Sequence, residues 1–361
     1  MPTPLRFELT TPTDDDRPVF ITGNFCDWYP DLESFRMQPL GGGRYALDFP
    51  AVVLPDVLEY KYTRGGWEHV ELAATSEPVQ NRTTRRRTGI RGDYVPHWRW
   101  YGHPYNADFL PGVELIDDAF DLPQLQTTRR IRVLLPHDYG HSDKLYPVLY
   151  LQDGQNLAGE GSSHGSWEID RQLAILASRR HHEVIIVSID HGHENRIREF
   201  TLDPTRAGVG QGLHYLNFVA QTVKPYVDAH FRTLPDAAHT GIGGSSLGGL
   251  ISVYGGVLFP GVFGRWLVFS PSLWIAPKLT DAIRGFNPSL PVRVYLYGGQ
   301  KESAHMVASL DRLSQSLRDS PGGQQTTVHT SIEQKGTHQE TWWGWEFPKA
   351  LEWLFYERST L

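Results

Sequence analysis

Two adjacent serines, Ser245 and Ser246, lie in a glycine-rich run that reads HTGIGGSSLGGL. The pattern G-x-S-x-G is typical of a nucleophilic serine on a sharp turn between a strand and a helix. Centred on Ser246, the pattern finds glycine two residues before and two residues after; centred on Ser245, it meets Leu247 where a glycine is required. The spacing therefore favours Ser246 as the nucleophile. It also favours the amide of Leu247, at the start of the following helix, as a donor to an oxyanion.

The same glycines could instead bind a phosphate or only close a turn. A phosphate loop of the Walker type needs a lysine directly after its last glycine, and no lysine lies between Lys224 and Lys278. A dinucleotide-binding fingerprint needs a third glycine, and Ser246 occupies that position. Phosphate binding is therefore disfavoured, while a purely structural glycine turn remains the alternative to a nucleophile.

A serine nucleophile needs a base, and the base needs an acid that orients it. In α/β-hydrolases the acid and then the histidine follow the serine along the chain. Glu302 is the acid in the turn after the expected strand 291–297, and His338 lies in the loop before the last expected helix. Both would lie at the carboxyl edge of a parallel sheet, where such folds place their ligand sites. We therefore predict a catalytic triad of Ser246, His338 and Glu302.

Other histidines and acids downstream of the serine fit these roles less well. His329 lies inside an expected strand, and His305 lies on the helix after the acidic turn. The competing acids lie within expected helices or directly before the histidine loop: Asp281, Asp311 and Glu333. Glu340, two residues after His338, could instead tether the loop, and a Ser–His pair with a displaced acid also remains open.

A second oxyanion donor is expected after an earlier strand of the same sheet. The largely apolar run VLYLQ at 148–152 is followed by DGQN. Gly154 permits a tight turn there, and the amide of Gln155 could then face the same pocket as that of Leu247. Asp153 is either a substrate contact or an ordinary turn residue, because aspartate is common in turns.

The spacing of apolar residues along the sequence changes near residue 100. Up to that point, short alternating runs are broken by glycine, proline, aspartate and asparagine, which is typical of strands and hairpins. From residue 113 onward, apolar strand runs alternate with segments of helical spacing, which is typical of a mostly parallel sheet covered by helices. We predict an all-β immunoglobulin-like sandwich at 1–100, a linker at 101–112 and an α/β-hydrolase domain at 113–361 with helices on both faces of its sheet.

The composition limits the classes of function. The 361 residues carry a net charge of −7 and 40% of them are hydrophobic, which favours a soluble globular protein and argues against binding to nucleic acid or to an anionic membrane. The N-terminus lacks the features of a signal peptide, no apolar run is long enough to span a membrane, and Cys26 is the single cysteine. We therefore expect a cytoplasmic protein. His191 and His193 are too few ligands for a zinc site, so neither a metal nor another cofactor is expected.

Several motifs occur in an order that resembles the Putative esterase family of α/β-hydrolases, which includes enterochelin, feruloyl and acetyl-xylan esterases and relatives of esterase D. The motifs are YPVLYLQDGQN, VIIVSID followed by RIREF, GGSSLGGL, FSPSLW, YLYGG and GTHQETWW, and they lie within residues 113–361. The resemblance implies serine ester hydrolysis with Ser246 as nucleophile and His338 as base. It also implies a substrate-facing arginine near the R-x-x-E segment, for which Arg196 and Arg198 are the candidates.

The first hundred residues resemble the early-set modules that bind glycogen or starch, such as the module of AMP-activated kinase. The motifs GNFCDWYP, LEYKYTRGGWEHVE and NRTT carry this resemblance. It implies a sugar platform made of Trp28, Lys61 and Trp67, in which indole faces stack on a glucose ring and the ammonium donates to hydroxyls. The two tryptophans could instead only cap the sandwich.

The predicted function is a carboxylic ester hydrolase that forms an acyl-enzyme on Ser246 and acts on a small-molecule substrate, either a small acyl ester or an acylated sugar. Two alternatives stay open. One is an esterase for a siderophore trilactone of the enterochelin type, and the other is a glucan-binding protein whose hydrolase domain is a non-catalytic scaffold. A glucan or sugar at the N-terminal module is the additional ligand that we expect.

Overall fold

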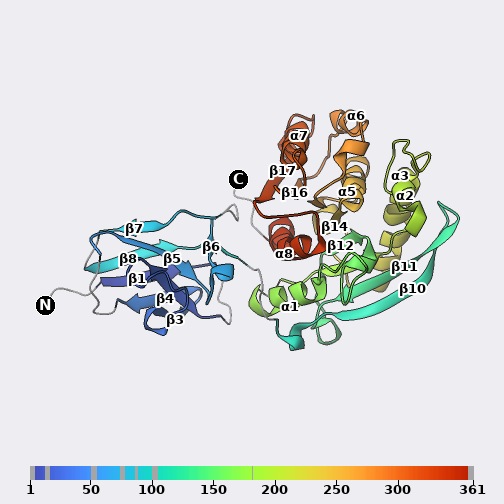
Figure 1. The fold of residues 1–361 in the computed structure, drawn as a ribbon. Coiled ribbons are helices and arrows are strands. Elements are labelled where there is room, and N and C mark those ends of the chain that lie inside the picture. The colour runs from blue at the N-terminus through green and yellow to red at the C-terminus, as the bar shows by residue number, and fades with distance from the viewer. Residues whose placement is uncertain are drawn as a thin grey trace. The chain divides into compact units, whose positions relative to one another are not determined.

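The computed structural model describes residues 5–12, 17–49, 55–73, 78–85, 88–99, 105–180 and 182–356. The chain divides into two compact units (Figure 1). One contains residues 1–104 together with 178–181, and the other contains residues 105–177 together with 182–361. Residues 101–104 of the predicted linker lie outside the described part of the chain.

The N-terminal unit consists of strands and short turns in its described part. Its elements are β1 (Leu5–Thr10), β2 (Val19–Gly23), β3 (Arg36–Gly41), β4 (Arg44–Asp48), β5 (Leu58–Thr63), β6 (Glu71–Leu72), β7 (Arg82–Thr84), β8 (Gly89–Tyr94) and β9 (His97–Trp98), with 3₁₀ turns at Glu33–Phe35 and Trp67–His69. Seven strands form one sheet in the order β7-β5-β2-β3-β4-β1-β8, and β6 pairs with β9. The rings of Phe7 on β1 and Tyr60 on β5 lie 5.1 Å apart although three strands separate β1 from β5 in the sheet. The sheet therefore folds over a shared apolar core, while its immunoglobulin-like topology stays a prediction.

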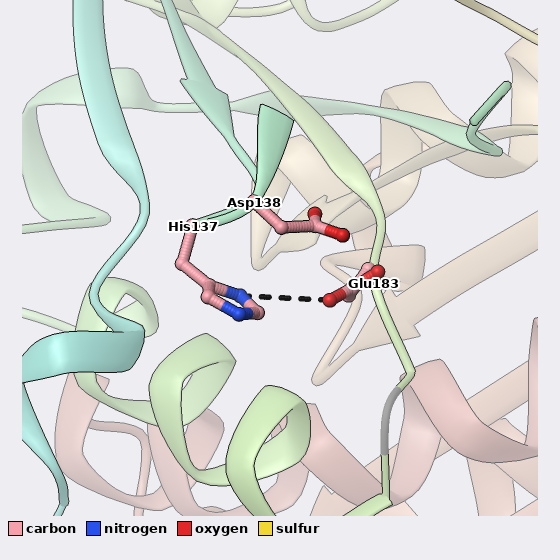
Figure 2. A group of neighbouring side chains, drawn as sticks. All are labelled: His137, Asp138 and Glu183. Atoms are coloured by element: carbon pink, nitrogen blue, oxygen red, sulfur yellow. Dashed lines mark ion pairs between the residues drawn. The ribbon is translucent and has the colours of Figure 1, made fainter. Parts of the chain in front are cut away.

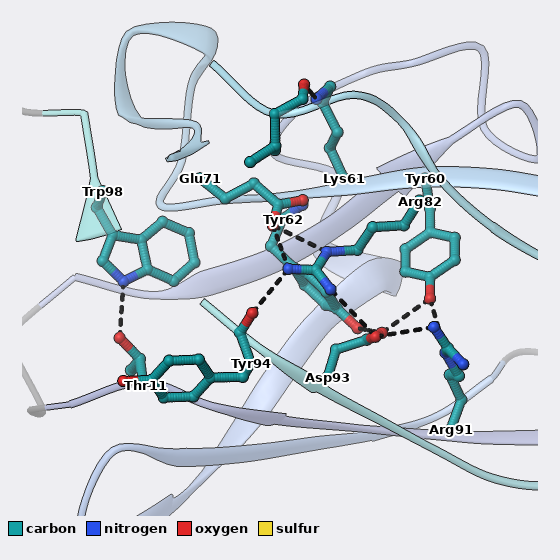
Figure 3. A network of polar contacts seen from close by, with 11 residues as sticks. Thr11, Tyr60, Lys61, Tyr62, Glu71, Arg82, Arg91, Asp93, Tyr94 and Trp98 are labelled. Carbon is teal, nitrogen blue, oxygen red and sulfur yellow. Dashed lines mark hydrogen bonds and ion pairs between the residues drawn. The ribbon is translucent and has the colours of Figure 1, made fainter. Parts of the chain in front are cut away.

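A network of ion pairs and hydrogen bonds joins several strands of this unit (Figure 3). The guanidinium of Arg82 on β7 binds Glu71 at 2.8 Å and Asp93 at 3.2 Å. The hydroxyls of Tyr60 and Tyr62 both donate to the carboxylate of Asp93, at 2.8 and 2.9 Å. Burial and the nearby Asp93 charge raise the pKa of Tyr60. Because removing one partner would leave a buried charge uncompensated, the network favours a single pairing of β5, β7 and β8.

The C-terminal unit is a sheet with helices on both faces. Its strands are β10 (Gly112–Leu122), β11 (Thr127–Leu135), β12 (Val148–Gln152), β13 (Ile185–Ile189), β14 (Thr240–Ser245), β15 (Arg265–Phe269), β16 (Val292–Gly299) and β17 (Thr326–Glu333). Its helices are α1 (Ile169–Arg180), α2 (Arg196–Glu199), α3 (Gly212–Phe218), α4 (Lys224–His230), α5 (Leu247–Leu258), α6 (Leu279–Arg284), α7 (Met306–Arg318) and α8 (Glu340–Leu351), with π-helical segments at Val219–Val223 and Glu352–Tyr356. The strand order is β10-β11-β13-β12-β14-β15-β16-β17, and the pairs from β13 to β17 are all parallel. This is the mostly parallel, helix-covered sheet that the sequence predicts for the second half of the chain.

Alternate residues of the central strands pack against different helices. On β12, Val148 and Tyr150 belong to an apolar cluster that includes residues of α3, α5, α6 and α7. Leu149 and Leu151 belong to the cluster that contains residues of α1 and α8. A strand that is buried on both faces is apolar along its whole length, which explains the continuous apolar runs in the sequence. No helix in the described residues combines the length and the apolarity that crossing a membrane requires.

Strand β10 was not predicted from the sequence. This strand lies at the edge of the sheet and pairs antiparallel with β11, with irregular register near Asp117. Most of its side chains are exposed. An exposed edge strand lacks the apolar run that marks a buried strand, so its sequence gives little sign of pairing.

Candidate active site

The structure places Ser246 in the turn between β14 and α5. Its backbone has φ 56° and ψ −119°, values that residues other than glycine rarely adopt and that mark a strained turn. The Ser246 amide donates to the carbonyl of Phe269 at 2.9 Å, and the Ser272 amide donates to the carbonyl of Ser246 at 3.0 Å. A side chain at Gly248 would lie 2.8 Å from the carboxylate of Asp153. The second glycine of the pattern therefore allows the helix to approach the neighbouring turn.

Glu302 and His338 lie side by side at the carboxyl edge of the sheet. Glu302 follows β16, His338 follows β17, and Nδ1 of the imidazole lies 2.7 Å from Oε2 of the carboxylate. The Glu302 side chain is 1% exposed, whereas that of His338 is 42% exposed. A carboxylate bound at Nδ1 favours the tautomer with its proton there, which leaves Nε2 as the basic nitrogen.

Glu302 is held by donors that were not predicted from the sequence. Its Oε1 accepts hydrogen bonds from the Ser270 hydroxyl at 2.7 Å and from the Gly299 amide at 2.6 Å. The indole N–H of Trp343 donates to Oγ of Ser270 at 2.9 Å, and the Trp343 ring meets that of His338 edge to face at 4.9 Å. Ser270 is fully buried. In the sequence, Ser270 belongs to the motif FSPSLW, which carries part of the family resemblance. That motif indicated no role for the serine.

Ser246 and His338 share two cavities but do not form a hydrogen bond with each other. The hydroxyl of Ser246 lies 3.2 Å from that of Ser272. Both Ser246 and His338 line one cavity of about 430 Å³ and another of about 350 Å³. Catalytic hydrogen bonds in unliganded enzymes are often long and tighten when substrate binds. The three residues of the predicted triad are therefore brought to one place.

A third and larger cavity also reaches Ser246, and His338 is not part of its lining. It has a volume of about 790 Å³ and lies against Leu247 at the start of α5. Most of its lining side chains are apolar: Ile197, Pro204, Ala207, Leu247, Trp274 and Ile275. Trp274 is 86% exposed and lines both this cavity and the one of 430 Å³. We call the 790 Å³ space the Leu247 cavity.

The cavity of about 350 Å³ has a polar lining that includes Asn156, His164, His191 and Glu340. The side-chain amide of Asn156 donates to the Glu340 carboxylate at 3.2 Å. Burial raises the pKa of Glu340. We call this space the Glu340 cavity. It offers both donors and acceptors to a ligand that touches His338.

Asp153 and Arg196 form a bidentate ion pair beside Ser246. Nε and Nη2 of Arg196 bind the two carboxylate oxygens at 2.6 and 2.8 Å. Burial works against the charge of Arg196, but the hydrogen bonds and charge of Asp153 outweigh it and raise the pKa of the guanidinium. Both residues line the Glu340 cavity, whereas Arg198 lines none of the three cavities that reach Ser246. The structure therefore brings one of the two predicted arginines to the site, already paired with an acid.

The backbone amides of Leu247 and Gln155 form no hydrogen bond with a backbone carbonyl of the described residues. The first opens helix α5, where backbone N–H groups have no partner within the helix. The second lies in the 3₁₀ turn Gly154–Asn156 after β12, the strand that pairs with β14. The side chain of Gln155 is bound elsewhere, because it donates to the carbonyl of His191 at 3.3 Å and accepts from the amide of His191 at 3.1 Å.

The predicted sugar platform belongs to the N-terminal unit. The rings of Trp28 and Trp67 lie 6.3 Å apart with their planes inclined by 38°, and Trp67 is 40% exposed. The ammonium of Lys61 donates to the carbonyl of Val79, and burial lowers the pKa of this lysine. The two indoles are thus neighbours, while the lysine is engaged within the unit. Their binding of a sugar stays a prediction.

One group of side chains in the described residues has ligand atoms spaced as in a metal site (Figure 2). Nδ1 of His137 lies 3.5 Å from the carboxylate of Glu183, and Asp138 lies beside them. The ammonium of Lys144 binds Asp138 at 2.6 Å and Glu183 at 3.0 Å. The ammonium of Lys144 therefore already pairs with both carboxylates, and we interpret the group as an ion-pair network.

Comparisons with known proteins agree with this architecture. The family described as Putative esterase matches residues 123–354. The uncharacterised protein YbbA of Bacillus subtilis is 29% identical over 254 residues, which are 64% of this chain and 95% of that protein. The BES protein of Bacillus cereus has a similar fold with a TM-score of 0.57 at 18% identity, covering 72% of this chain and 98% of that one. The enterobactin esterase of Shigella flexneri, solved with enterobactin, has a TM-score of 0.56 at 16% identity and covers 97% of this chain and 92% of its own. The family match spans most of the C-terminal unit, and the chain therefore belongs to the Putative esterase family of α/β-hydrolases.

Proposed function

We propose that the protein is a serine carboxylic ester hydrolase with Ser246 as nucleophile, His338 as general base and Glu302 as the orienting acid. The observation that carries this proposal is the 2.7 Å contact between Glu302 and His338 beside a serine on a strained turn. A buried carboxylate, an imidazole and such a serine are the parts that acyl transfer through an acyl-enzyme requires.

The reaction follows from these positions. Nε2 of His338 takes the hydroxyl proton of Ser246 while Oγ attacks the ester carbonyl, and the negative oxygen that forms is stabilised by the amides of Leu247 and Gln155. The imidazolium then gives its proton to the departing alcohol oxygen. Water, activated by the same imidazole, cleaves the acyl-enzyme and restores the serine.

The linings of the three cavities support a proposal for where the two sides of the ester bind. The leaving alcohol must contact His338, because that residue protonates its oxygen. The alcohol therefore occupies the Glu340 cavity or the cavity of 430 Å³, which His338 lines. The acyl group occupies the Leu247 cavity, which reaches Ser246 without His338. Its size and apolar lining favour acyl groups longer than acetyl.

The polar lining on the alcohol side supports a hydroxyl-rich alcohol. Asn156, His164 and Glu340 can exchange hydrogen bonds with the hydroxyls of a sugar. An ester of a sugar with an apolar acyl group is therefore the substrate class that the site favours.

A siderophore trilactone is the second candidate, because the enterobactin esterase of Shigella flexneri resembles this chain over both units. The pairing of Arg196 with Asp153 argues against it, since the cation that would attract an anionic ferric catecholate is already neutralised. Hydrolysis of ferric enterobactin by the wild-type protein distinguishes the two candidates.

A comparison of serine variants tests the proposal. We expect Ser246→Ala to lose hydrolysis of p-nitrophenyl acetate and butyrate by several orders of magnitude, because removal of a triad member commonly has that effect. Ser245→Ala is the matched control, since the adjacent serine has the wrong spacing, and we expect it to keep activity. Equal hydrolysis by the wild type and both variants would refute the assignment.

A further inference from the structure

The peptide group that joins Gly154 to Gln155 is held from one side by two side chains. Nη2 of Arg132 donates to the carbonyl of Gly154 at 2.8 Å, and the hydroxyl of Ser188 lies 3.4 Å from the same oxygen. The amide of Leu157 is also 3.4 Å away, within the turn. This carbonyl therefore accepts its shortest hydrogen bond from a positive charge.

The sheet order fixes the direction in which that carbonyl points. Arg132 lies on β11 and Ser188 on β13, where the two residues pair directly. Both strands are on the same side of β12, and β14 with Ser246 is on the other side. In a trans peptide the carbonyl and the N–H point in opposite directions. A carbonyl directed at β11 and β13 thus directs the N–H of Gln155 towards the side of β14 and Ser246.

The peptide is confined as well as bound. A side chain at Gly154 would lie 2.5 Å from Oδ1 of Asp190 and 2.6 Å from Oγ of Ser188. Arg132 also reaches Asp190, at 3.4 Å, so the carboxylate partly neutralises and positions the guanidinium. The turn cannot rotate this peptide without breaking these contacts.

We propose that Arg132, assisted by Ser188, is a positioning residue of the oxyanion hole. It holds the Gln155 N–H in the direction of the developing oxyanion. Its charge on the carbonyl also polarises the same peptide and strengthens the N–H as a donor, because hydrogen bonds in a chain reinforce one another. This role rests on the proposed function, since it needs an ester carbonyl attacked by Ser246.

The test compares Arg132→Met, Arg132→Lys and Ser188→Ala with Arg130→Met. Arg130 lies two residues earlier on the same strand and pairs with the exposed Asp118, so its variant controls for the loss of a positive charge nearby. The readouts are kcat and KM for p-nitrophenyl butyrate and the inhibition constant of a trifluoromethyl ketone, whose hemiketal oxygen mimics the oxyanion. Removing an oxyanion donor lowers kcat by about 100-fold to 1,000-fold. Since Arg132→Met leaves the donor in place but free to turn, we expect a loss of about 10-fold to 100-fold.

The expected pattern separates this role from a structural one. In Arg132→Met, we expect kcat and the affinity for the ketone to fall by similar factors, while KM changes less than about threefold. We expect Arg132→Lys to recover part of the kcat lost in Arg132→Met, and Ser188→Ala to lose less kcat than Arg132→Met. Arg130→Met should have the kcat and the ketone affinity of the wild type. The proposal is overturned if Arg132→Met and Ser188→Ala bind the ketone as tightly as Arg130→Met does. Should Arg132→Met fail to fold, the same comparison with Ser188→Ala and Arg132→Lys decides. If Ser246→Ala abolishes hydrolysis while the Arg132 variants keep full kcat, this inference fails alone; if Ser246→Ala stays active, the proposed function fails.

Discussion

The proposed placement of the acyl group in the Leu247 cavity predicts how hydrolysis depends on acyl length. The comparison uses p-nitrophenyl acetate, butyrate and hexanoate, which share one alcohol and differ only in methylene groups. Each methylene that becomes buried contributes about 0.8 kcal/mol. Four additional methylenes, fully buried, would therefore favour hexanoate over acetate by about 3 kcal/mol, or roughly 200-fold in kcat/KM.

The structure lowers that figure, because the walls of the cavity are not all buried. Trp274 is 86% exposed and Ala207 is exposed, so an acyl chain along them keeps one side in water. With about half of the surface of the acyl chain buried, we expect kcat/KM for hexanoate to exceed that for acetate by about 10-fold to 20-fold.

Two variants test whether this cavity is the cause. Ala207→Trp places an indole in the Leu247 cavity and should remove the preference for hexanoate while acetate hydrolysis changes little. Ala119→Trp is the control, since Ala119 is exposed on edge strand β10 and lines none of the three cavities. Trp274→Ala should also reduce the hexanoate preference by removing one apolar wall. A wild-type kcat/KM that is flat or falls from acetate to hexanoate would refute the acyl assignment, as would an unchanged preference in Ala207→Trp.

Three further predictions concern the acid, the packing of helix α5 and the N-terminal unit. Glu302→Gln should lower kcat for p-nitrophenyl butyrate by about 100-fold to 10,000-fold with little change in KM, because a neutral amide no longer stabilises the imidazolium. Glu333→Gln is the control and should keep the wild-type kcat. A loss of kcat below about fivefold in Glu302→Gln would indicate that another residue is the acid. Gly256→Ala should reduce the free energy of unfolding by about 1–3 kcal/mol, since its new methyl would lie 1.9 Å from the ring of Trp266, whereas Gly261→Ala meets no atom within 4 Å and should leave the denaturant midpoint unchanged. Equal midpoints for these two variants would contradict the packing argument. If Trp28 and Trp67 form a sugar platform, wild-type protein should co-sediment with glycogen and Trp67→Ala should not; absence of wild-type co-sedimentation would end that hypothesis.

Local sequence patterns predicted much of the fold of the second half of the chain. Apolar strand runs alternate with helical spacing there, and the structure has the corresponding parallel sheet with helices on both faces. The turn at Ser246 also depends on local sequence, because the glycines two residues before and after the serine permit a sharp turn between a strand and a helix. The positions of Glu302 and His338 after two successive expected strands predicted that they lie close together, because the carboxyl ends of adjacent parallel strands meet at one edge of the sheet.

Contacts between distant segments had no such local signal. Ser270, which donates to the Glu302 carboxylate, and Trp343, which donates to Ser270, come from the ends of different elements. Both lie in motifs that carry the family resemblance, but those motifs do not indicate this contact. The contact of Arg132 had no local signal either, because Arg132 precedes the peptide that it binds by 22 residues on a strand that is not adjacent to β12. Edge strand β10 was missed because exposed side chains follow no strong apolar pattern.

The sequence by itself therefore determined the alternation of buried strands and helices in the second half of the chain, its mostly parallel sheet and the position of Ser246 in a turn between a strand and a helix. Spacing of small and apolar residues acts over a few positions, and these features depend only on such spacing. Which donors bind the Glu302 carboxylate, which cavities reach Ser246, and which side chain binds the Gly154 carbonyl were decided by the tertiary structure alone. Those features depend on strand order, which brings residues together that the chain separates by tens of positions.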